Sequence, residues 1–293
     1  MRHARNSLAS RISNRLWQLR KRLRWLVQRP ATADVLCIVG CQRSGTTLML
    51  RIFDRDPNAR VFGEASRLSS NDPNRIRLDP LPEVRRRLER ERAPLLVLKP
   101  LVESQRTPEL LAALPLATRS RCRALWVFRH YRDVAASDLA HFGINNGIAN
   151  LRPIAEGVSG NWRSENVSPD VRDRVCERFG EVMNPHDAAV LFWWVRNRLF
   201  FDLALDANPA VLMCRYEDLV AAPAAAIQEI YDALDLPFLG ERSVAEVHAG
   251  SLQRGRDLSL SPEVEELASS LLDRLETAYR ARRAAALQQT LSK

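Results

Sequence analysis

Apolar residues follow two patterns along the chain: short continuous runs, and longer segments in which they recur every three or four positions. Continuous runs are typical of parallel strands buried on both faces, and the recurring pattern is typical of amphipathic helices. The runs predict strands at 34–39, 95–98, 124–128 and 210–214. The recurring pattern predicts helices at 46–55, 83–92, 107–115, 132–141, 186–206, 222–234 and 262–287. This alternation indicates an α/β fold in three layers, with a central parallel sheet flanked by helices.

Residues 8–27 carry a helical stripe of their own. Its apolar positions are Leu8, Ile12, Leu16, Leu19, Leu23 and Leu26. Trp17, Trp25 and many arginines surround the stripe, and residues 1–30 contain nine Lys or Arg and no acid. Such a helix fits an anionic membrane surface, where tryptophan prefers the headgroup level. The same pattern also fits packing against the protein's own domain or a partner, and the composition resembles a transit peptide.

The domain organisation follows from these patterns. We expect a basic amphipathic arm at 1–33 and one domain at 34–287. Within the domain, residues 143–170 are rich in Gly, Asn and Ser and show weak periodicity. Long loops in compact domains often cover binding sites, so we interpret this segment as an insertion that serves as a lid or binding loop.

Composition narrows the class of protein. Of 293 residues, 46% are hydrophobic and 27% charged, which excludes wholesale disorder. No uncharged apolar run reaches the ~18–20 residues of a membrane span, and the N-terminal segment lacks the apolar core of a secretory signal. The five cysteines (Cys37, Cys41, Cys122, Cys176 and Cys214) form no CxxC pair. We therefore expect reduced thiols, no metal site and a cytoplasmic protein, which is peripheral on a membrane if the arm binds one.

The formal net charge of +9 comes from the arm. Removing residues 1–30 leaves 35 basic and 35 acidic residues, so the domain is neutral and its charge does not indicate nucleic-acid binding. The chain has only three lysines, Lys21, Lys99 and Lys293. Lys99 ends a predicted strand, where an unpaired ammonium is costly, so we expect it to face an anion rather than to be an ordinary surface lysine.

A candidate anion site follows the first predicted strand. The segment from Gly40 to Thr47 reads GCQRSGTT, and a strand, a glycine turn and a helix start present free N–H groups to a ligand. The Gly40-x4-Gly45 spacing matches the nucleotide P-loop, but Thr46 stands where that motif needs lysine. The basic residue of this loop is instead Arg43.

A second candidate anion site follows another predicted strand. Arg129 lies at the carboxyl end of that strand, the edge at which open α/β sheets bind ligands. Ser137 follows eight residues later, about two helical turns, so its hydroxyl can return to the same mouth. Arg132 and Asp133 are expected to form a structural ion pair. Two separate anion sites suggest a nucleotide with anionic groups at both its 5′ and 3′ ends.

Together these motifs resemble those of sulfotransferases that use 3′-phosphoadenylyl sulfate (PAPS). The resemblance implies that the 5′-phosphosulfate is held by Arg43, Ser44, Gly45, Thr46 and Thr47. It implies that Arg129 and Ser137 hold the 3′-phosphate. The later segments RYEDL (215–219) and SLQRGR (251–256) are similar to further family segments, and this adds Tyr216 and Arg256 to the expected nucleotide contacts. The resemblance covers about residues 34–287 and implies a P-loop-like three-layer α/β fold.

The same resemblance implies the catalytic residues. Lys99 and Arg43 would neutralise charge on the transferring sulfuryl group. Many cytosolic members place a histidine two residues after this lysine, but here that position is Leu101. The Golgi-type and tyrosylprotein branches use a downstream glutamate, and Glu64 occupies a similar position, so we expect Glu64 to be the general base.

Other roles remain open for these residues. Glu64 could instead pair with Arg67 or cap a helix, and His130 or His141 could be the base. The expected activity is transfer of a sulfuryl group from PAPS to a carbohydrate, phenol, lipid or tyrosyl hydroxyl, with the insertion 143–170 on the acceptor side. The alternatives are a P-loop-type kinase or NTPase, or a non-catalytic nucleotide-binding protein at a membrane.

Overall fold

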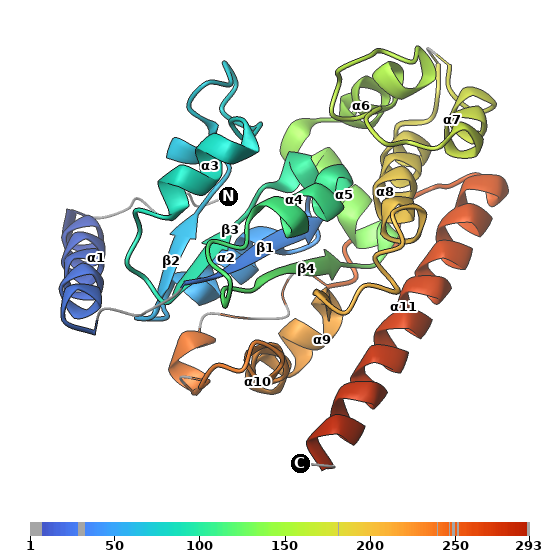
Figure 1. Ribbon diagram of the computed structural model, residues 1–293. Coiled ribbons are helices and arrows are strands. Elements are labelled where there is room, and N and C mark those ends of the chain that lie inside the picture. Colours follow the sequence, from blue (N-terminus) through green and yellow to red (C-terminus); the bar gives the residue numbers. More distant parts are fainter. Residues whose placement is uncertain are drawn as a thin grey trace.

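Five parallel strands form the central sheet of the computed structural model. They are β1 (Asp34–Gly40), β2 (Ala59–Phe62), β3 (Leu95–Leu98), β4 (Cys122–Phe128) and β5 (Val211–Arg215). Their order across the sheet is β2–β3–β1–β4–β5 (Figure 1), which confirms the α/β fold with a parallel sheet. The structure describes residues 8–28, 33–180, 182–238, 240–245, 247, 250 and 252–291.

Helices cover both faces of this sheet (Figure 1). The first six are α1 (Leu8–Gln28), α2 (Thr46–Asp54), α3 (Leu81–Leu88), α4 (Thr107–Ala113), α5 (Tyr131–Phe142) and α6 (Asn146–Ala155). The others are α7 (Pro169–Cys176), α8 (Pro185–Asp202), α9 (Tyr216–Ala221), α10 (Pro223–Ala233) and α11 (Pro262–Leu291). Short 3-10 turns lie at η1 (Arg67–Ser69), η2 (Leu101–Arg106) and η3 (Glu241–Ser243).

The strands are buried on both faces, as their continuous apolar runs predict. Leu36 and Ile38 of β1 belong to a buried cluster with α2 and α10, while Cys37 and Val39 point to the opposite face, towards α4, α8 and α11. Successive strand side chains alternate between faces, so a run without polar residues has to be covered on both. The sheet is the middle layer of three.

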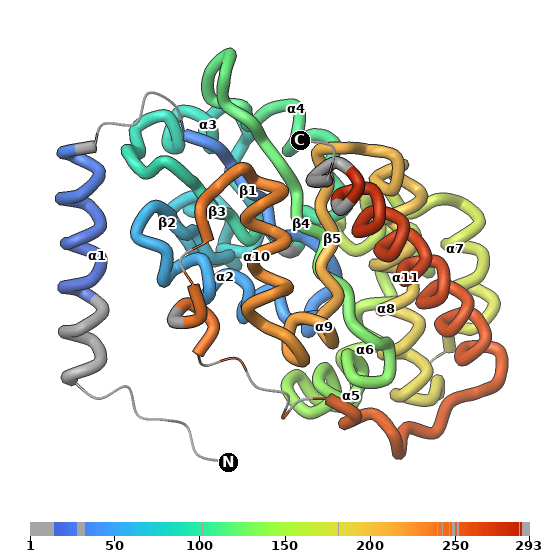
Figure 2. The backbone as a smooth tube through the Cα atoms, turned by 90° about the horizontal axis from the view of Figure 1, so that it is seen from below, coloured from blue at the N-terminus to red at the C-terminus, as the bar shows by residue number. Residues whose placement is uncertain are grey.

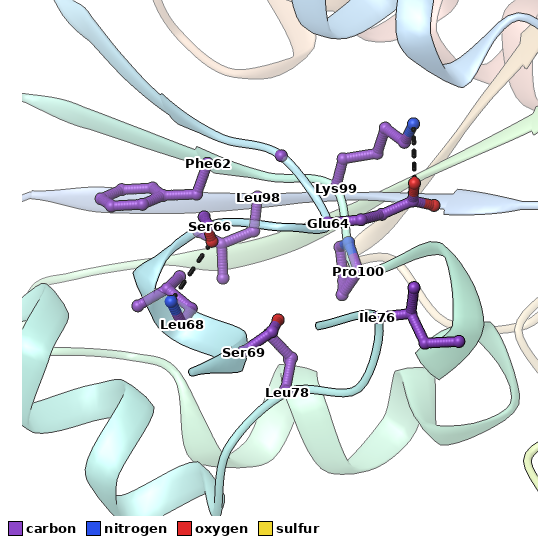
Figure 3. A pocket seen from close by; sticks show the side chains of 11 residues that line it. Phe62, Glu64, Ser66, Leu68, Ser69, Ile76, Leu78, Leu98, Lys99 and Pro100 are labelled. Carbon is purple, nitrogen blue, oxygen red and sulfur yellow. Dashed lines mark hydrogen bonds and ion pairs between the residues drawn. The ribbon is translucent and has the colours of Figure 1, made fainter. Parts of the chain in front are cut away.

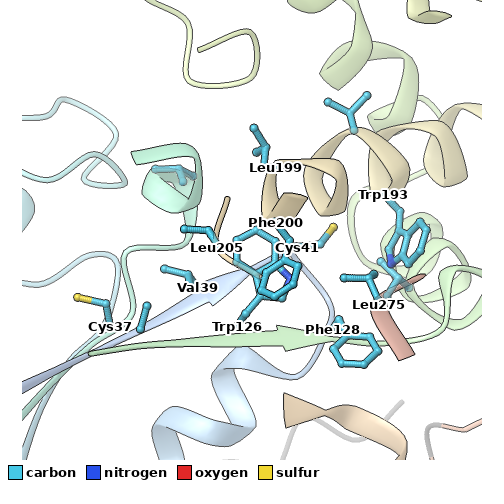
Figure 4. Close-up of a cluster of buried hydrophobic side chains, with 14 of the residues drawn as sticks. Cys37, Val39, Cys41, Trp126, Phe128, Trp193, Leu199, Phe200, Leu205 and Leu275 are labelled. Atoms are coloured by element: carbon cyan, nitrogen blue, oxygen red, sulfur yellow. The ribbon is translucent and has the colours of Figure 1, made fainter. Parts of the chain in front are cut away.

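The larger core, on the α8 side, is built around aromatic residues (Figure 4). Trp126 of β4 packs against Phe200 of α8, with ring centroids 5.4 Å apart, and Phe128 meets Tyr279 of α11 edge to face at 5.8 Å. Trp193 of α8 is fully buried in the same cluster. Tilted and edge-to-face rings of this kind fix the angle at which the two helices lie on the sheet.

The predicted strands and the observed strands differ at one place. All four predicted strands are present within two residues of their expected bounds. The edge strand β2 was not predicted, because its four residues include the half-exposed Arg60 and do not form a continuous apolar run. Residues 143–170 are not irregular throughout, since they contain α6, which holds Pro153 within it.

The strand order places a topological switch point at the carboxyl ends of β1 and β4. From β1 the chain crosses to β2 on one side of the sheet, whereas from β4 it continues to β5 on the other. Ligands of open α/β sheets bind at such a switch point. Gly40 ends β1 with φ 129°, and a Cβ there would lie 2.3 Å from the carbonyl oxygen of Val127. Only glycine allows the two strand ends to come this close.

Helix α1 lies at the outer edge of the molecule, beside β2 (Figure 2). Trp25 of α1 is buried in the larger core cluster. Three side chains also bond to the domain: Trp17 Nε1 donates to the carbonyl oxygen of Asp54 at 3.0 Å, Lys21 Nζ donates to the same oxygen at 3.0 Å, and Trp25 Nε1 donates to the carbonyl oxygen of Pro57 at 2.8 Å. The two tryptophans therefore bind the domain, and binding of the arm to a membrane surface stays a prediction. In the described part of the chain, no helix is both long and apolar enough to span a bilayer.

Candidate functional site

The segment from Gly40 to Thr47, which joins β1 to α2 and is here called the phosphate loop, has the geometry of an anion site. Gly40, Arg43 and Gly45 all have positive φ, which turns the backbone sharply before α2 begins at Thr46. Ser44 is buried, and its Oγ has no hydrogen-bond partner in the described structure. The N–H groups of the first helical turn and this hydroxyl lie together at the end of β1. They form the binding groups that a phosphate or sulfate needs.

A buried hydroxyl steadies the start of this loop. Ser104 Oγ accepts from Gly40 N at 3.0 Å and donates to Gly40 O at 3.0 Å, and Ser104 is fully buried in η2. This residue was missed at the sequence level, because a serine in a short, mostly polar segment carries no signal of a contact 64 residues away. Ser104 therefore links the start of the loop to η2, the turn that follows Lys99 in the chain.

Lys99 and Glu64 meet at the ends of the adjacent strands β3 and β2 (Figure 3). Lys99 Nζ donates to Thr47 Oγ1 at 2.8 Å and lies 3.5 Å from Glu64 Oε2. Lys99 is buried, whereas Glu64 is half-buried. The expected alternative partner of Glu64, Arg67, instead pairs with Glu91. One ammonium therefore touches both the phosphate loop and the candidate base.

A small pocket lies beside this pair, between β2, β3 and the segment that contains η1 (Figure 3). Its apolar lining residues are Phe62, Leu68, Ile76, Leu78 and Leu98, and its polar ones include Ser66, Ser69, Glu64 and Lys99. The candidate base thus has apolar walls on one side and the phosphate loop on the other.

The second predicted anion site adjoins the first. Arg129 is buried just after β4, and its Nη1 donates to the carbonyl oxygen of Arg43 at 3.4 Å. Arg43 Nε in turn donates to Ser137 Oγ of α5 at 3.1 Å. Burial lowers the pKa of the Arg43 guanidinium from its usual value, with the nearby Arg129 acting in the same direction and Asp138 opposing it. Three basic and hydroxyl side chains predicted from separate motifs converge on one crevice.

Tyr216 connects the two anion sites. Its ring lies under the Arg129 guanidinium, 4.4 Å from ring centroid to Cζ. A Cβ at Gly45 would lie 2.3 Å from the same ring, so the ring also packs closely against the phosphate loop. A guanidinium over a tyrosine face is a favourable cation–π arrangement. Tyr216 therefore fixes the position of Arg129 relative to Gly45.

The loop at 252–257 is attached to the second site through Asp133. Asp133 Oδ2 accepts from Gln253 N at 2.9 Å and lies 3.4 Å from Arg129 Nη2. The predicted ion pair between Arg132 and Asp133 is wrong, because Arg132 reaches away to Glu265 of α11 at 2.5 Å. Acid and base neighbours on a helix point to different sides, and each found a partner on another segment.

Arg256 stands apart from the other predicted site residues. It is exposed, and its guanidinium donates to Gln253 within its own loop. Gly255 next to it presses against the backbone of Arg132, where a Cβ would lie 2.2 Å from the carbonyl oxygen. The loop is thus close to the second candidate anion site, but the Arg256 side chain extends along the surface.

The two histidines considered as bases have other positions. His130 is the N-cap of α5, where Nδ1 accepts from Arg132 N at 3.3 Å, and its own N–H donates to Glu217 at 2.9 Å. Burial lowers the pKa of His130, so the neutral ring that accepts this bond is favoured. His141 is exposed near the end of the same helix. Glu64 is the candidate that contacts Lys99.

The insertion packs against the segment that follows Lys99. Glu165 Oε2 accepts from Gln105 Nε2 of η2 at 2.8 Å and from Arg77 Nη2 at 2.9 Å. Asn166 Nδ2 donates to the carbonyl oxygen of Gln105 at 2.9 Å. Residues 143–170 therefore lie over the same η2 turn that holds the phosphate loop through Ser104.

Comparison with known proteins gives the family. The family model described as a sulfotransferase domain matches residues 33–278. The chain belongs to the sulfotransferase family. It is thus an enzyme of sulfuryl transfer, in a family whose sulfate donor is PAPS. A search of curated proteins finds no match for this sulfotransferase.

Solved structures similar to the sulfotransferase come from distant proteins. The sulfotransferase domain of the Synechococcus PCC 7002 olefin synthase is 17% identical, with a TM-score of 0.46 over 84% of this chain and 98% of that one. Sulfotransferase STF9 from Mycobacterium avium is 14% identical, with a TM-score of 0.45 over 90% and 82%. Mouse sulfotransferase SULT7A1 complexed with PAP is 13% identical, with a TM-score of 0.38 over 83% and 73%.

Proposed function

We propose that this sulfotransferase moves a sulfuryl group from PAPS to an acceptor hydroxyl, with Glu64 as the general base. The observation that carries the proposal is the position of the Lys99 ammonium, 2.8 Å from Thr47 in the phosphate loop and 3.5 Å from Glu64. Donor-side and acceptor-side groups meet at this one charge. A carbohydrate, phenol, lipid or tyrosyl hydroxyl can all supply the attacking oxygen.

The residues present fit the donor at both of its ends. The loop from Arg43 to Thr47 offers helix N–H groups and the unpartnered Ser44 hydroxyl to the 5′-phosphosulfate. Arg129 and Ser137 would hold the 3′-phosphate, with Tyr216 under the guanidinium. Arg256, being exposed on the adjoining loop, would close on the nucleotide from outside.

The chemistry then follows from these positions. The acceptor oxygen attacks sulfur in line, its proton passes to Glu64, and the bond from sulfur to the bridging phosphate oxygen breaks to release 3′,5′-ADP. Lys99 and Arg43 stabilise the negative charge that spreads over the sulfuryl and leaving oxygens. Catalysis is positioning and charge stabilisation, as in the related transfer of phosphoryl groups.

The acceptor-side role of residues 143–170 belongs to the same proposal. Their bonds to η2 place them next to the turn that follows Lys99. The cytoplasmic location also stays a proposal. The anionic membrane surface predicted for residues 8–27 concerns α1, outside this site.

Replacing Glu64 by glutamine tests the base directly. Glutamine keeps the size of the side chain and cannot accept the proton, so we expect turnover at saturating PAPS to fall by roughly 10²- to 10⁴-fold. Affinity for 3′,5′-ADP, measured by calorimetry, should stay within about twofold, because Lys99 and the phosphate loop remain. Transfer of labelled sulfate from PAPS to one identified acceptor is the readout.

The matched control is Glu89→Gln, which makes the same chemical change in an exposed ion pair with Arg85. We expect it to leave turnover unchanged. Near-normal turnover of Glu64→Gln together with a severe loss in His141→Ala or His130→Asn would assign the base to a histidine. A wild-type protein that binds 3′,5′-ADP yet transfers sulfate to no acceptor would support the non-catalytic alternative.

A further inference from the structure

We propose that α1 docks the protein on an anionic lipid bilayer through its leucine face, while its opposite face stays bound to the domain. This goes beyond sulfuryl transfer and does not depend on the identity of the base or the acceptor. The argument starts from the side chains of residues 15–27, which the structure describes.

The leucine face points away from the protein. Its four leucines follow one another at steps of three or four residues, and Val27 lies four residues after the third of them; all five are between 46% and 84% exposed: Leu16, Leu19, Leu23, Leu26 and Val27. Residues with this spacing form one continuous strip along a helix. A strip of this kind is typically buried against a core, and large exposed apolar patches mark interaction sites.

The opposite face of α1 is fixed to the domain. Lys21 and Trp25 are 1% and 2% exposed, and both bond to backbone carbonyl oxygens at the junction between α2 and β2. Lys21 also pairs with Asp54 at 3.5 Å and lies between the rings of Trp17 and Trp25, 5.9 and 5.8 Å from their centroids. The exposed strip is therefore held in a defined orientation, and α1 cannot roll over to bury it without breaking these contacts.

The charges that flank the leucine face argue against a second copy of this chain as its binding partner. Leu16, Leu19, Leu23 and Leu26 alternate at steps of three and four, as the seam of a coiled coil does. The flanking positions that face a partner hold Arg15, Arg20 and Arg22, all exposed, and α1 contains no acid. Pairing two such helices, in either direction, sets arginine against arginine on both sides of the seam.

An anionic bilayer satisfies both the apolar strip and its flanks. Leucines would enter the interface between headgroups and acyl chains, and the arginines on either side would meet lipid phosphates. Because α1 stands at the convex outer edge of the molecule, a flat surface can reach its whole described length (Figure 2). An acidic helix of another protein could match one flank and the strip, but a lipid surface supplies anions along both flanks.

Vesicle flotation tests the proposal on the full chain. We expect the protein to float with vesicles of equal parts phosphatidylglycerol and phosphatidylcholine at low salt, and to stay behind with phosphatidylcholine alone. Leu23→Glu should weaken this binding by about tenfold or more, because it removes apolar contact and adds repulsion. The matched control is Val182→Glu, which makes an equivalent change at a valine that is exposed elsewhere. It should float like the wild type.

Three results would overturn the proposal. One is a full-length protein that does not float with the anionic vesicles at low salt. Another is Leu23→Glu floating as well as Val182→Glu. The third is a wild-type dimer in size-exclusion chromatography that Leu23→Glu dissociates, which would assign the strip to a second copy. Calorimetry with 3′,5′-ADP on every variant reports whether the domain is folded, so failure here is separate from failure of the proposed sulfuryl transfer.

Discussion

Arg129 depends on its surroundings more than any other predicted ligand. Its guanidinium is buried, lies 3.4 Å from Asp133, and rests on the face of Tyr216. A buried arginine held on several sides loses little freedom when an anion arrives, because the planar group is already oriented. This makes Arg129 a suitable clamp for one phosphate, and its effect should be confined to that phosphate.

Replacing Arg129 by glutamine should therefore weaken the binding of one nucleotide, 3′,5′-ADP, much more than that of another, 5′-AMP. We expect affinity for 3′,5′-ADP to fall by roughly tenfold to a hundredfold, since a charged hydrogen bond is lost. Affinity for 5′-AMP, which lacks the 3′-phosphate, should change by less than about threefold. Isothermal calorimetry with both nucleotides measures the difference. Equal weakening of the two would mean that Arg129 supports the loop as a whole instead of reading the 3′-phosphate.

Individual site residues could be predicted from the sequence where they belong to a recognisable motif. Arg43, Lys99 and Arg129 could be named because each is a basic residue at the end of an apolar strand. Tyr216 could be named through the family resemblance, but its contact with Arg129 could not, and Ser104, which holds Gly40, could not be named at all, because both act on residues far away along the chain. An aromatic ring or a serine in a buried segment looks the same whether or not it supports a site.

Helix α5 shows how an element is begun and held. It starts at the end of β4, where His130 accepts from Arg132 N and Glu217 accepts from His130 N. The cap therefore needs a neutral imidazole, and burial lowers the pKa of His130 below its usual value of about 6.5. In the pH range just below 6.5 the unfolded chain binds a proton that the folded chain does not. The stabilisation is full above that range and is lost as the pH falls through the folded value.

His130→Asn removes this titration and keeps a capping oxygen. We expect the free energy of unfolding, from urea denaturation, to fall less for this variant than for the wild type between about pH 7.5 and about pH 5.5. His141→Asn, a change at the exposed histidine of the same helix, should retain the wild-type pH dependence. An identical pH dependence in wild type and His130→Asn would contradict the role given to the cap.

Strand β2 and helix α6 were missed by the sequence patterns for two different physical reasons. Strand β2 has a single neighbour in the sheet, so only part of its surface is buried and no continuous apolar run is needed. Helix α6 contains Gly147 and Pro153, which argue against a helix on local propensity. Gly147 is required there by tertiary contact, because a Cβ would lie 2.6 Å from the backbone nitrogen of Ala189 in α8. Packing against α8 overrides local preference.

At the scale of the whole molecule, the attachment of α1 to the domain centres on Lys21 and Trp25, the two buried side chains among its described ones. Trp25→Ala removes one of the two most buried side chains on the face of α1 that is bound to the domain. We expect trypsin to cleave within α1 roughly ten times faster or more, because the helix must detach to be cut and the detached state becomes more populated. Leu23→Ala, at an exposed position on the opposite face of α1, should be cleaved at the wild-type rate.

Protection of the domain by 3′,5′-ADP should be the same in both variants, as seen by the survival of the large fragment. If Trp25→Ala is no more sensitive than Leu23→Ala, the tryptophan contact does not hold the helix.

The amphipathic pattern alone predicted the helix but not which face meets the domain. Ordinary amphipathicity would have turned the leucines inward, whereas hydrogen bonds from two tryptophans and a lysine to backbone carbonyl oxygens set the opposite orientation.

Under the proposed mechanism, the contact between Lys99 and Glu64 favours an order in which the donor binds before the acceptor. With no donor bound, the carboxylate is engaged by the ammonium, so an acceptor that enters first meets a base that is already occupied. The phosphosulfate brings its own negative charge to Lys99 and releases Glu64, which favours donor before acceptor. After transfer, the bound 3′,5′-ADP carries no sulfuryl group, so Lys99 has lost that negative charge. A second acceptor that binds before 3′,5′-ADP dissociates then forms a dead-end complex, because no sulfuryl group is present to transfer. Under the proposed mechanism, steady-state rates should therefore decline at high acceptor concentration, and raising PAPS should relieve that decline only in part.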